Sequence, residues 1–306
     1  METRARSILI QNYHPTGTQA LIRDFKRLGF TVYAPDSDWG RIKYYGPNEG
    51  LGGELVSYEA FMATPPGYCL ITCKAQEEDL KAIARSHGDK LILNIAQQHH
   101  VYEPGIADIM ICPDITTFDT YPSPVRHKLF YCPRPHLSAE PIKNIEQSFS
   151  GKLACSFISM PGWWPRGTAA LTEFKDKYPG PCRMYGHEAA DGSLSHAACN
   201  EMMASSFFTV HFKEEEAYGL SCLESMMLGT PVVSLRSFMA EKTLGRFFLS
   251  PDTAVLADSI DEAVERLCSM TLEEYASMSG AARERVLALT ADERTVDLLA
   301  DALEQA

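Results

Sequence analysis

The sequence has no apolar run approaching the roughly 18 to 20 residues that span a bilayer, nor the long apolar stretch of a signal peptide. Its nine cysteines are scattered, and the closest pair, Cys69 and Cys73, has no second pair at zinc-finger spacing. We therefore expect a cytoplasmic protein with no transmembrane segment, no disulfides and no metal site.

An excess of positive charge is also missing, since the net charge is −12. Residues 1–150 carry 15 basic and 17 acidic groups, and residues 151–306 carry 13 and 23. This excludes a wholly basic nucleic-acid surface, although the near-neutral first half leaves room for a local patch. The 306 residues, 45% hydrophobic and 22% charged, are typical of a soluble protein of two domains.

Short apolar runs alternate with helical patterns in the first half, as is typical of a parallel sheet covered by helices. We expect a Rossmann-like domain over residues 1–145, ending near a proline-rich stretch. Its strands are predicted at Ser7–Gln11, Gly29–Ala34, Tyr68–Thr72, Lys90–Ile95, Ile109–Cys112 and Leu129–Cys132, and its helices at Thr18–Leu28 and Glu77–Ser86.

The second half repeats this rhythm and predicts another Rossmann-like domain over residues 146–306. Apolar residues at helical spacing from Ser259 to Gln305 predict a helical tail, with closing helices over 260–306. Two such modules place the ligand in a cleft. Strands are predicted at Leu153–Ser159, Cys182–Tyr185, Phe207–His211 and Val232–Leu235, and helices near Thr168–Lys177 and Leu220–Leu228.

The most informative stretch is an acidic loop that leads into a glycine-opened helix, where seven residues separate Glu216 from Glu224. If Gly219 and Leu220 open the helix, their N–H groups and the helix dipole can hold an anion. Carboxylates beside an anion repel it unless they bind neutral hydroxyls. The pattern therefore suggests a pyrophosphate between two polyol groups, as in a nucleotide sugar.

Glu216-Ala-Tyr-Gly-Leu-Ser-Cys-Leu-Glu224, followed by Gly229-Thr-Pro-Val-Val, resembles the signature of retaining glycosyltransferases of family 4. The similarity covers about the last 150 residues. It implies the GT-B fold, in which two Rossmann-like domains face a cleft, the first on the acceptor side and the second on the donor side.

The same resemblance implies a role for each residue of the motif. Glu216 is expected to contact the donor sugar's hydroxyls and Glu224 the ribose. Gly219 and Leu220 are expected to present amides to the donor phosphates, and Tyr218 to belong to the same donor site.

One loop departs from the family pattern of an Arg followed a turn later by Lys-Gly, which together hold the pyrophosphate. Here only Arg166-Gly167 has a counterpart, and Arg166 is expected to neutralise a phosphate. Trp163 is expected to stack on a sugar or base. A wedge between domains is the alternative for Trp163 and Trp164.

In the first domain, His99 and His100 follow a predicted strand where the family places a histidine beside the donor sugar. We expect His100 to act in catalysis and His99 to line the donor site. Gly17 follows the first strand, at the sheet edge where ligands bind, and allows close approach of a sugar.

The resulting hypothesis is a retaining, metal-independent transfer in which the leaving diphosphate deprotonates the acceptor hydroxyl and needs no cofactor besides the nucleotide sugar. The alternatives are an epimerase- or phosphorylase-like enzyme, and a non-catalytic nucleotide-sugar-binding protein. The acceptor is a saccharide, a small molecule or a hydroxylated DNA base. Glu214 and Glu215 are interpreted as loop charges, with Lys213 as their partner.

Overall fold

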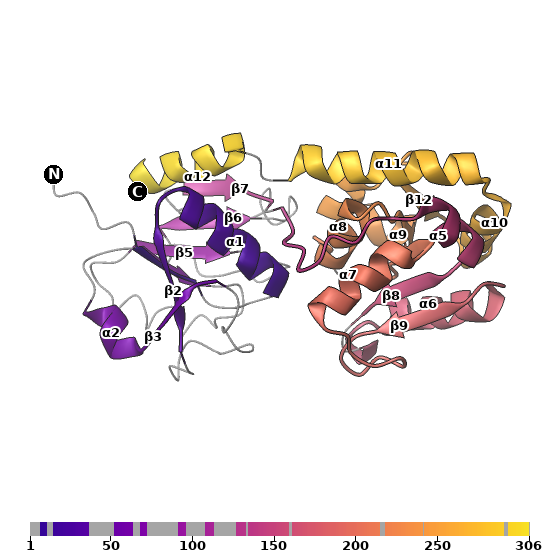
Figure 1. Cartoon of the computed structure of the whole chain (residues 1–306), viewed down its shortest axis with the longest axis horizontal. Helices are drawn as coiled ribbons and strands as arrows, with labels where there is room; N and C mark the ends of the chain where they lie inside the picture. The colour runs from indigo at the N-terminus through magenta and orange to yellow at the C-terminus, as the bar shows by residue number, and fades with distance from the viewer. Residues whose placement is uncertain are drawn as a thin grey trace. The chain divides into compact units, whose positions relative to one another are not determined.

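The computed structural model describes residues 7–10, 15–36, 52–63, 68–71, 91–95, 108–112, 127–132, 134–158, 161–214, 218–240, 242–290 and 293–305. The chain divides into two compact units, one formed by Met1–His136 with Ala291–Ala306 and the other by Leu137–Thr290. Each unit contains one parallel sheet with helices beside it (Figure 1).

The first unit has a seven-stranded sheet in the order β3-β2-β1-β4-β5-β6-β7, parallel throughout. The predicted strands are present, with ends shifted by at most two residues, whereas the predicted helix Glu77–Ser86 lies outside the described residues. The elements are β1 (Ser7–Ile10), α1 (Pro15–Arg27), β2 (Thr31–Pro35), β3 (Glu54–Val56), α2 (Tyr58–Met62), β4 (Tyr68–Ile71), β5 (Leu91–Ile95), β6 (Ile109–Cys112), β7 (His127–Phe130) and α12 (Glu293–Gln305).

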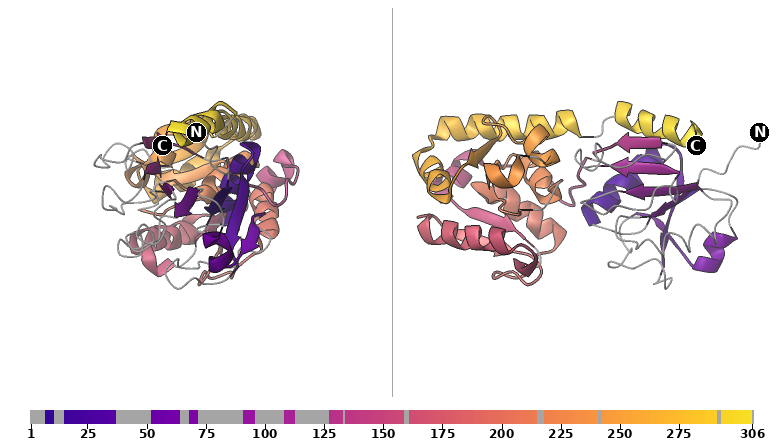
Figure 2. Two further views of the ribbon diagram at one scale, coloured as in Figure 1. Left: turned by 90° about the vertical axis from the view of Figure 1, so that its left-hand side faces the viewer. Right: turned by 180° about the vertical axis from the view of Figure 1, so that it is seen from behind.

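The core of this unit joins the two ends of the chain. Alternate residues of β1 and β6 meet α1 and α12 in one apolar cluster, so both helices cover the same face of the sheet (Figures 1 and 2). The cluster includes Ile8, Ile10, Leu21, Phe25, Ile109, Ile111, Leu299 and Leu303.

This arrangement differs from the expected division, which assigned the whole tail to the second domain. The tail is helical as predicted, but α12 belongs to the first unit because Leu299 and Leu303 are buried in that unit's core. The boundary also falls near residue 136 instead of 145. The side-chain oxygen of Asn200, a residue of the second unit, accepts hydrogen bonds from the backbone N–H groups of Ser138 and Ala139. These bonds hold residues 138 and 139 in the second unit.

The second unit has a five-stranded parallel sheet in the order β12-β11-β10-β8-β9. Its strands are β8 (Ala154–Phe157), β9 (Cys182–Tyr185), β10 (Phe208–Val210), β11 (Val232–Leu235) and β12 (Ala254–Ala257). Its helices are α5 (Ile145–Gly151), η1 (Pro161–Trp163), α6 (Pro165–Lys177), α7 (His196–Ser205), α8 (Leu220–Met227), α9 (Arg236–Met239), η2 (Leu244–Phe248), α10 (Ile260–Ser269) and α11 (Leu272–Leu289).

Helices lie on both faces of this sheet, because the chain moves one way along the sheet from β8 to β9 and the other way from β9 to β10, β11 and β12. Right-handed crossovers in opposite directions lie on opposite faces. Helix α6 packs with α10, while α7 and α11 pack with α8 (Figures 1 and 2). Local sequence explains several helix starts, because Ser195, Ser259 and Thr271 each accept a backbone N–H at the N-cap of α7, α10 and α11. In the described part of the chain, no helix is both long and apolar enough to cross a membrane.

Candidate functional site

The start of α8 has the backbone geometry that the sequence predicts. Gly219 is its N-cap in the left-handed conformation, with φ 62°, and a Cβ there would meet Leu244 Cδ2 at 2.7 Å. The positive φ therefore favours glycine here, and any larger residue would also have to push the Leu244 side chain aside. The amides of Leu220 and Ser221 precede the first intrahelical bonds and face the helix end, where an anion can accept them.

Glu224 lies further along α8, and its side chain is buried, with 5% of the residue exposed. Its Oε1 is 3.2 Å from Nε2 of His196, the first residue of α7. Burial, reinforced by the nearby Glu224, raises the pKa of the Cys199 thiol to about 11. Hydrogen-bonded hydroxyls of Ser225 and Thr209 tie α8 to β10, so the helix that carries Glu224 is fixed on the sheet.

Arg166, the residue expected to neutralise a donor phosphate, lies in the first turn of α6. Arg166 is exposed, and its guanidinium lies over the Phe238 ring, 5.2 Å from the centroid. The backbone amides of Arg166 and Gly167 donate to the carboxylate of Glu214 at 3.0 and 2.8 Å. The Glu214 side chain, expected to be a solvated loop charge, instead caps α6. Lys213 places its Nζ over the Trp164 ring, 5.8 Å from the centroid.

The aromatic residues expected at the donor site differ in exposure. Trp163 ends the short helix η1 and is 66% exposed, so its ring is open to solvent. Tyr218 and Leu220 are buried, so their side chains pack within the unit. The role expected of Leu220 rests on its backbone amide, which lies in the first turn of α8, and it stays a prediction.

Three expected site residues, Glu216, His99 and His100, lie outside the described residues. Gly17 is described, and it lies buried in the first turn of α1 at the carboxyl end of β1. The helix begins earlier than predicted, at Pro15, a residue type suited to the first helical position.

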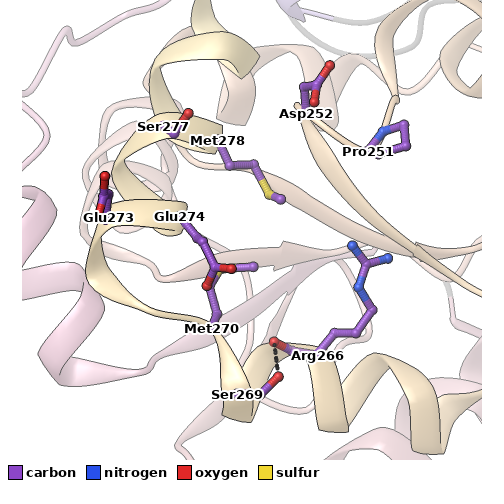
Figure 3. A pocket seen from close by; sticks show the side chains of 9 residues that line it. All are labelled: Pro251, Asp252, Arg266, Ser269, Met270, Glu273, Glu274, Ser277 and Met278. Carbon is purple, nitrogen blue, oxygen red and sulfur yellow. Dashed lines mark hydrogen bonds between the residues drawn. The ribbon is translucent and has the colours of Figure 1, made fainter.

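A hollow of about 520 Å³ in the second unit lies elsewhere (Figure 3). It is formed by the turn at Pro251 and Asp252, Arg266 of α10, and the first turns of α11. That turn precedes β12, so the hollow lies at the amino edge of the sheet, opposite the carboxyl edge where α8 begins. Among the described residues, no three His, Cys, Asp or Glu side chains are placed to share a metal ion.

The sequence did not predict the roles of two residues in this region, His196 and Glu214. His196 was missed together with helix α7, although Ser195 at the N-cap is a start signal that was available. The contact of Glu214 with α6 leaves no local sequence signal, because it joins segments far apart in the chain.

No family model and no curated protein sequence matches this chain, but solved structures do. HepE from Anabaena, in complex with UDP and glucose, has a TM-score of 0.70 at 10% identity, covering 98% of this chain and 99% of HepE. Alpha-glucosyltransferase (AGT) in complex with UDP has a TM-score of 0.69 at 12% identity, covering 97% of this chain and 98% of AGT. TarM matches 77% of this chain with a TM-score of 0.56 at 11% identity, and the match spans 54% of TarM.

These likenesses, together with the two parallel α/β units, establish the GT-B fold that the sequence predicts. At 10 to 12% sequence identity, these likenesses show the fold alone.

Proposed function

We propose that this protein is a glycosyltransferase that moves a sugar from a nucleoside diphosphate to an acceptor hydroxyl, with retention of anomeric configuration. The observation that carries the proposal is Glu224, a buried carboxylate on a helix that starts at an αL glycine at the carboxyl edge of a parallel sheet. A buried charge needs polar partners. His196 supplies one, and a carboxylate is also a suitable acceptor for the two hydroxyls of a ribose.

The donor site is then assembled by the second unit. The diphosphate accepts hydrogen bonds from the backbone amides of Leu220 and Ser221, and the guanidinium of Arg166 neutralises its charge. Glu224 binds the ribose, and Glu216 binds hydroxyls of the transferred sugar. HepE and AGT were solved with UDP, which makes a uridine nucleotide the first donor to test.

In the proposed reaction, the bond between the anomeric carbon and the diphosphate oxygen breaks. The acceptor oxygen forms the new bond on the same face, and its proton passes to the leaving diphosphate. Arg166 and the α8 amides stabilise the charge that develops on that leaving group. Because the diphosphate is the base, the step needs neither a metal ion nor a protein carboxylate as base. The family resemblance assigns a role beside the sugar to His100, with His99 as the alternative.

We propose a saccharide or small-molecule acceptor. One AGT structure holds DNA containing an HMU base, so an oligonucleotide with a hydroxylated base belongs in the acceptor panel.

The test is a thermal-shift screen over UDP-, GDP-, ADP- and CDP-sugars, followed by analysis of the product. A donor at a hundred times its dissociation constant adds roughly 2.7 kcal/mol to the free energy of unfolding. We expect one nucleotide class to raise the melting temperature and the product to retain the donor's configuration. No shift with any donor contradicts the proposal. An epimerised nucleotide sugar, or binding without transfer or hydrolysis, would indicate one of the two alternative functions.

A further inference from the structure

A second hollow, of about 620 Å³, lies on the first unit beside helix α1. Arg23, Lys26 and Arg27 of α1 line it together with His136, from the segment that follows β7. Among the described residues that line this hollow, none is acidic. Its size suits a small molecule, and its charge suits an anion.

The three cations of α1 lie on one face of the helix. Arg23 is three residues before Lys26 and four before Arg27, the spacings at which helical side chains are neighbours. Lys26 and Arg27 are exposed, and both lie in the last turn. Within the described part of the chain, Lys26 makes neither an ion pair nor a hydrogen bond, so its charge is available to a ligand. Cations in a last turn also offset the helix dipole, so these two residues alone do not indicate a site.

Arg23, one turn earlier, is held in a fixed orientation. Its Nε donates to Oδ1 of Asp24 at 2.8 Å, and its Nη2 donates to the backbone oxygen of Arg134 at 3.2 Å. Asp24 is fully buried, and its other oxygen accepts the hydroxyl of Tyr131. The Arg23 side chain is 34% exposed, and its Nη1 donates to no described residue. Because the guanidinium is already oriented, little entropy is lost when it binds a ligand.

The chemistry of the hollow fits a phosphate group. A phosphomonoester carries nearly two negative charges and three acceptor oxygens, which match a guanidinium and a neighbouring ammonium. Asp24 balances the charge of Arg23, so the net positive charge comes from the other cations of the hollow. Ile22 and Gly52 supply an apolar wall for the rest of the ligand, since a Cβ added at Gly52 would lie 3.6 Å from Ile22 Cγ2.

The charge of the whole chain favours a small ligand over a polymer. The net charge is −12, and the first 150 residues carry more acidic than basic groups. An extended polyanion would therefore meet repulsion beyond the hollow.

We propose that this hollow binds a small, soluble phosphomonoester, with its phosphate at Arg23, Lys26 and Arg27 and its carbon skeleton against Ile22. The inference goes beyond the proposed function, because binding here does not require that the protein transfers a sugar. It assigns the first unit an anion site of its own, formed by residues that the donor site does not use.

The test is calorimetric titration of the whole protein with ribose 5-phosphate at low ionic strength, where exposed charges are least screened. We expect ribose 5-phosphate to bind and ribose to give no signal. Lys26→Gln should weaken binding roughly three- to tenfold, because a hydrogen bond to a charged group is lost, and Lys26→Glu should weaken it further. Both variants should fold, since Lys26 is exposed. Lys175→Gln is the matched control, because Lys175 is an exposed lysine in the last turn of α6.

Absence of ribose 5-phosphate binding overturns the proposal, and so does equal affinity in Lys26→Glu. Arg166→Gln should bind ribose 5-phosphate normally, and loss of binding in that variant would place the phosphate in the second unit instead. Vesicles containing phosphatidic acid and a single-stranded oligonucleotide are titrated in parallel. If Lys26 is needed only for binding one of these, the ligand is a lipid or a nucleic acid and the proposal is wrong. Lys26-dependent binding of ribose 5-phosphate without any sugar transfer would contradict the proposed function alone.

Discussion

His196 Nε2 lies 3.2 Å from Glu224 Oε1, which joins the first residue of α7 to the buried carboxylate of α8. A carboxylate only accepts hydrogen bonds, so this bond needs a proton on Nε2. It fixes the orientation of the Glu224 carboxylate from the side of α7. The proposed ribose contact therefore depends on a pair of residues from two helices.

The first prediction concerns this pair. His196→Ala should weaken affinity for UDP roughly tenfold, since a hydrogen bond to a charged group contributes about 1.5 kcal/mol or more. Isothermal titration measures the affinity. His187→Ala is the matched control, because His187 precedes the same helix with a side chain 72% exposed. Equal affinity in the two variants would show that Glu224 holds its orientation without His196.

The second prediction concerns Glu224 itself. Glu224→Ala should weaken binding of UDP alone by roughly tenfold or more, because two charge-assisted bonds to ribose are lost. Glu224→Gln keeps the size of the side chain and separates loss of charge from loss of packing. Glu201→Ala, which removes an exposed carboxylate of α7, should bind normally. Unchanged affinity in Glu224→Ala removes this residue from the ribose contact.

The third prediction concerns the glycine that opens α8. Gly219→Ala should lower stability by about 1 kcal/mol through its positive φ, and by more through the contact with Leu244. It should also weaken donor binding, because the α8 amides shift. Gly192 has φ 79°, and a Cβ added there would meet nothing within 4 Å, so Gly192→Ala carries the backbone cost alone. If both variants lose equal stability and bind UDP normally, the close contact at Gly219 does not matter.

The sequence predicted the region around α8 well because its signals are local. A glycine before the helix, apolar spacing along it and Gly229 after it set the bounds of Leu220–Met227 almost to the residue. The buried strands were found for the same reason, as short apolar runs between turns.

What the sequence missed depends on contacts between distant segments. The apolar stripe of α12 shows that the helix packs, but not that Leu299 and Leu303 return to the first unit's core. Helix α7 has apolar residues on several sides, so its spacing gave no clear period, and His196 was lost with it. The capping role of Glu214 follows only from the approach of α6 in space.

The fourth prediction concerns the pH dependence of stability. Burial lowers the pKa of Lys143 to about 7, and its Nζ donates to Ser206 O and Thr230 Oγ1. Because the unfolded chain binds this proton up to its ordinary pKa of 10.5, the folded state holds fewer protons between about pH 7 and 10.5. Lys143 therefore makes unfolding costlier as pH rises through this window, by at most about 1.4 kcal/mol per pH unit.

Urea unfolding of the unmodified protein and of Lys143→Met at pH 7, 8 and 9 measures this effect. The difference in unfolding free energy should shift in favour of the unmodified protein as pH rises. The buried thiol of Cys155, whose pKa burial raises to about 12, acts in the opposite direction. It is present in both proteins and cancels from the difference. A difference independent of pH would show that Lys143 stays protonated when folded.

The fifth prediction separates the two glutamates of the motif. If Glu216 binds the transferred sugar, its contact strengthens as the glycosidic bond breaks, and removing it lowers turnover more than binding. Glu216→Gln should reduce kcat roughly 10- to 150-fold, the range expected for losing a charge-assisted bond of about 1.5 to 3 kcal/mol. Its affinity for UDP, which lacks the sugar, should stay nearly unchanged. In Glu224→Ala, by contrast, the affinity for UDP should fall more than kcat does.

Steady-state kinetics beside UDP titrations of both variants test this contrast, because uniform binding appears in KM and transition-state binding in kcat. Glu215→Gln controls for the charge of the acidic loop, since it removes one negative charge from the adjacent position. A general effect of loop charge would slow both loop variants alike. A specific contact slows Glu216→Gln alone. If Glu216→Gln turns over at the normal rate, Glu216 is a solvated loop residue, and the sugar must be held by other groups.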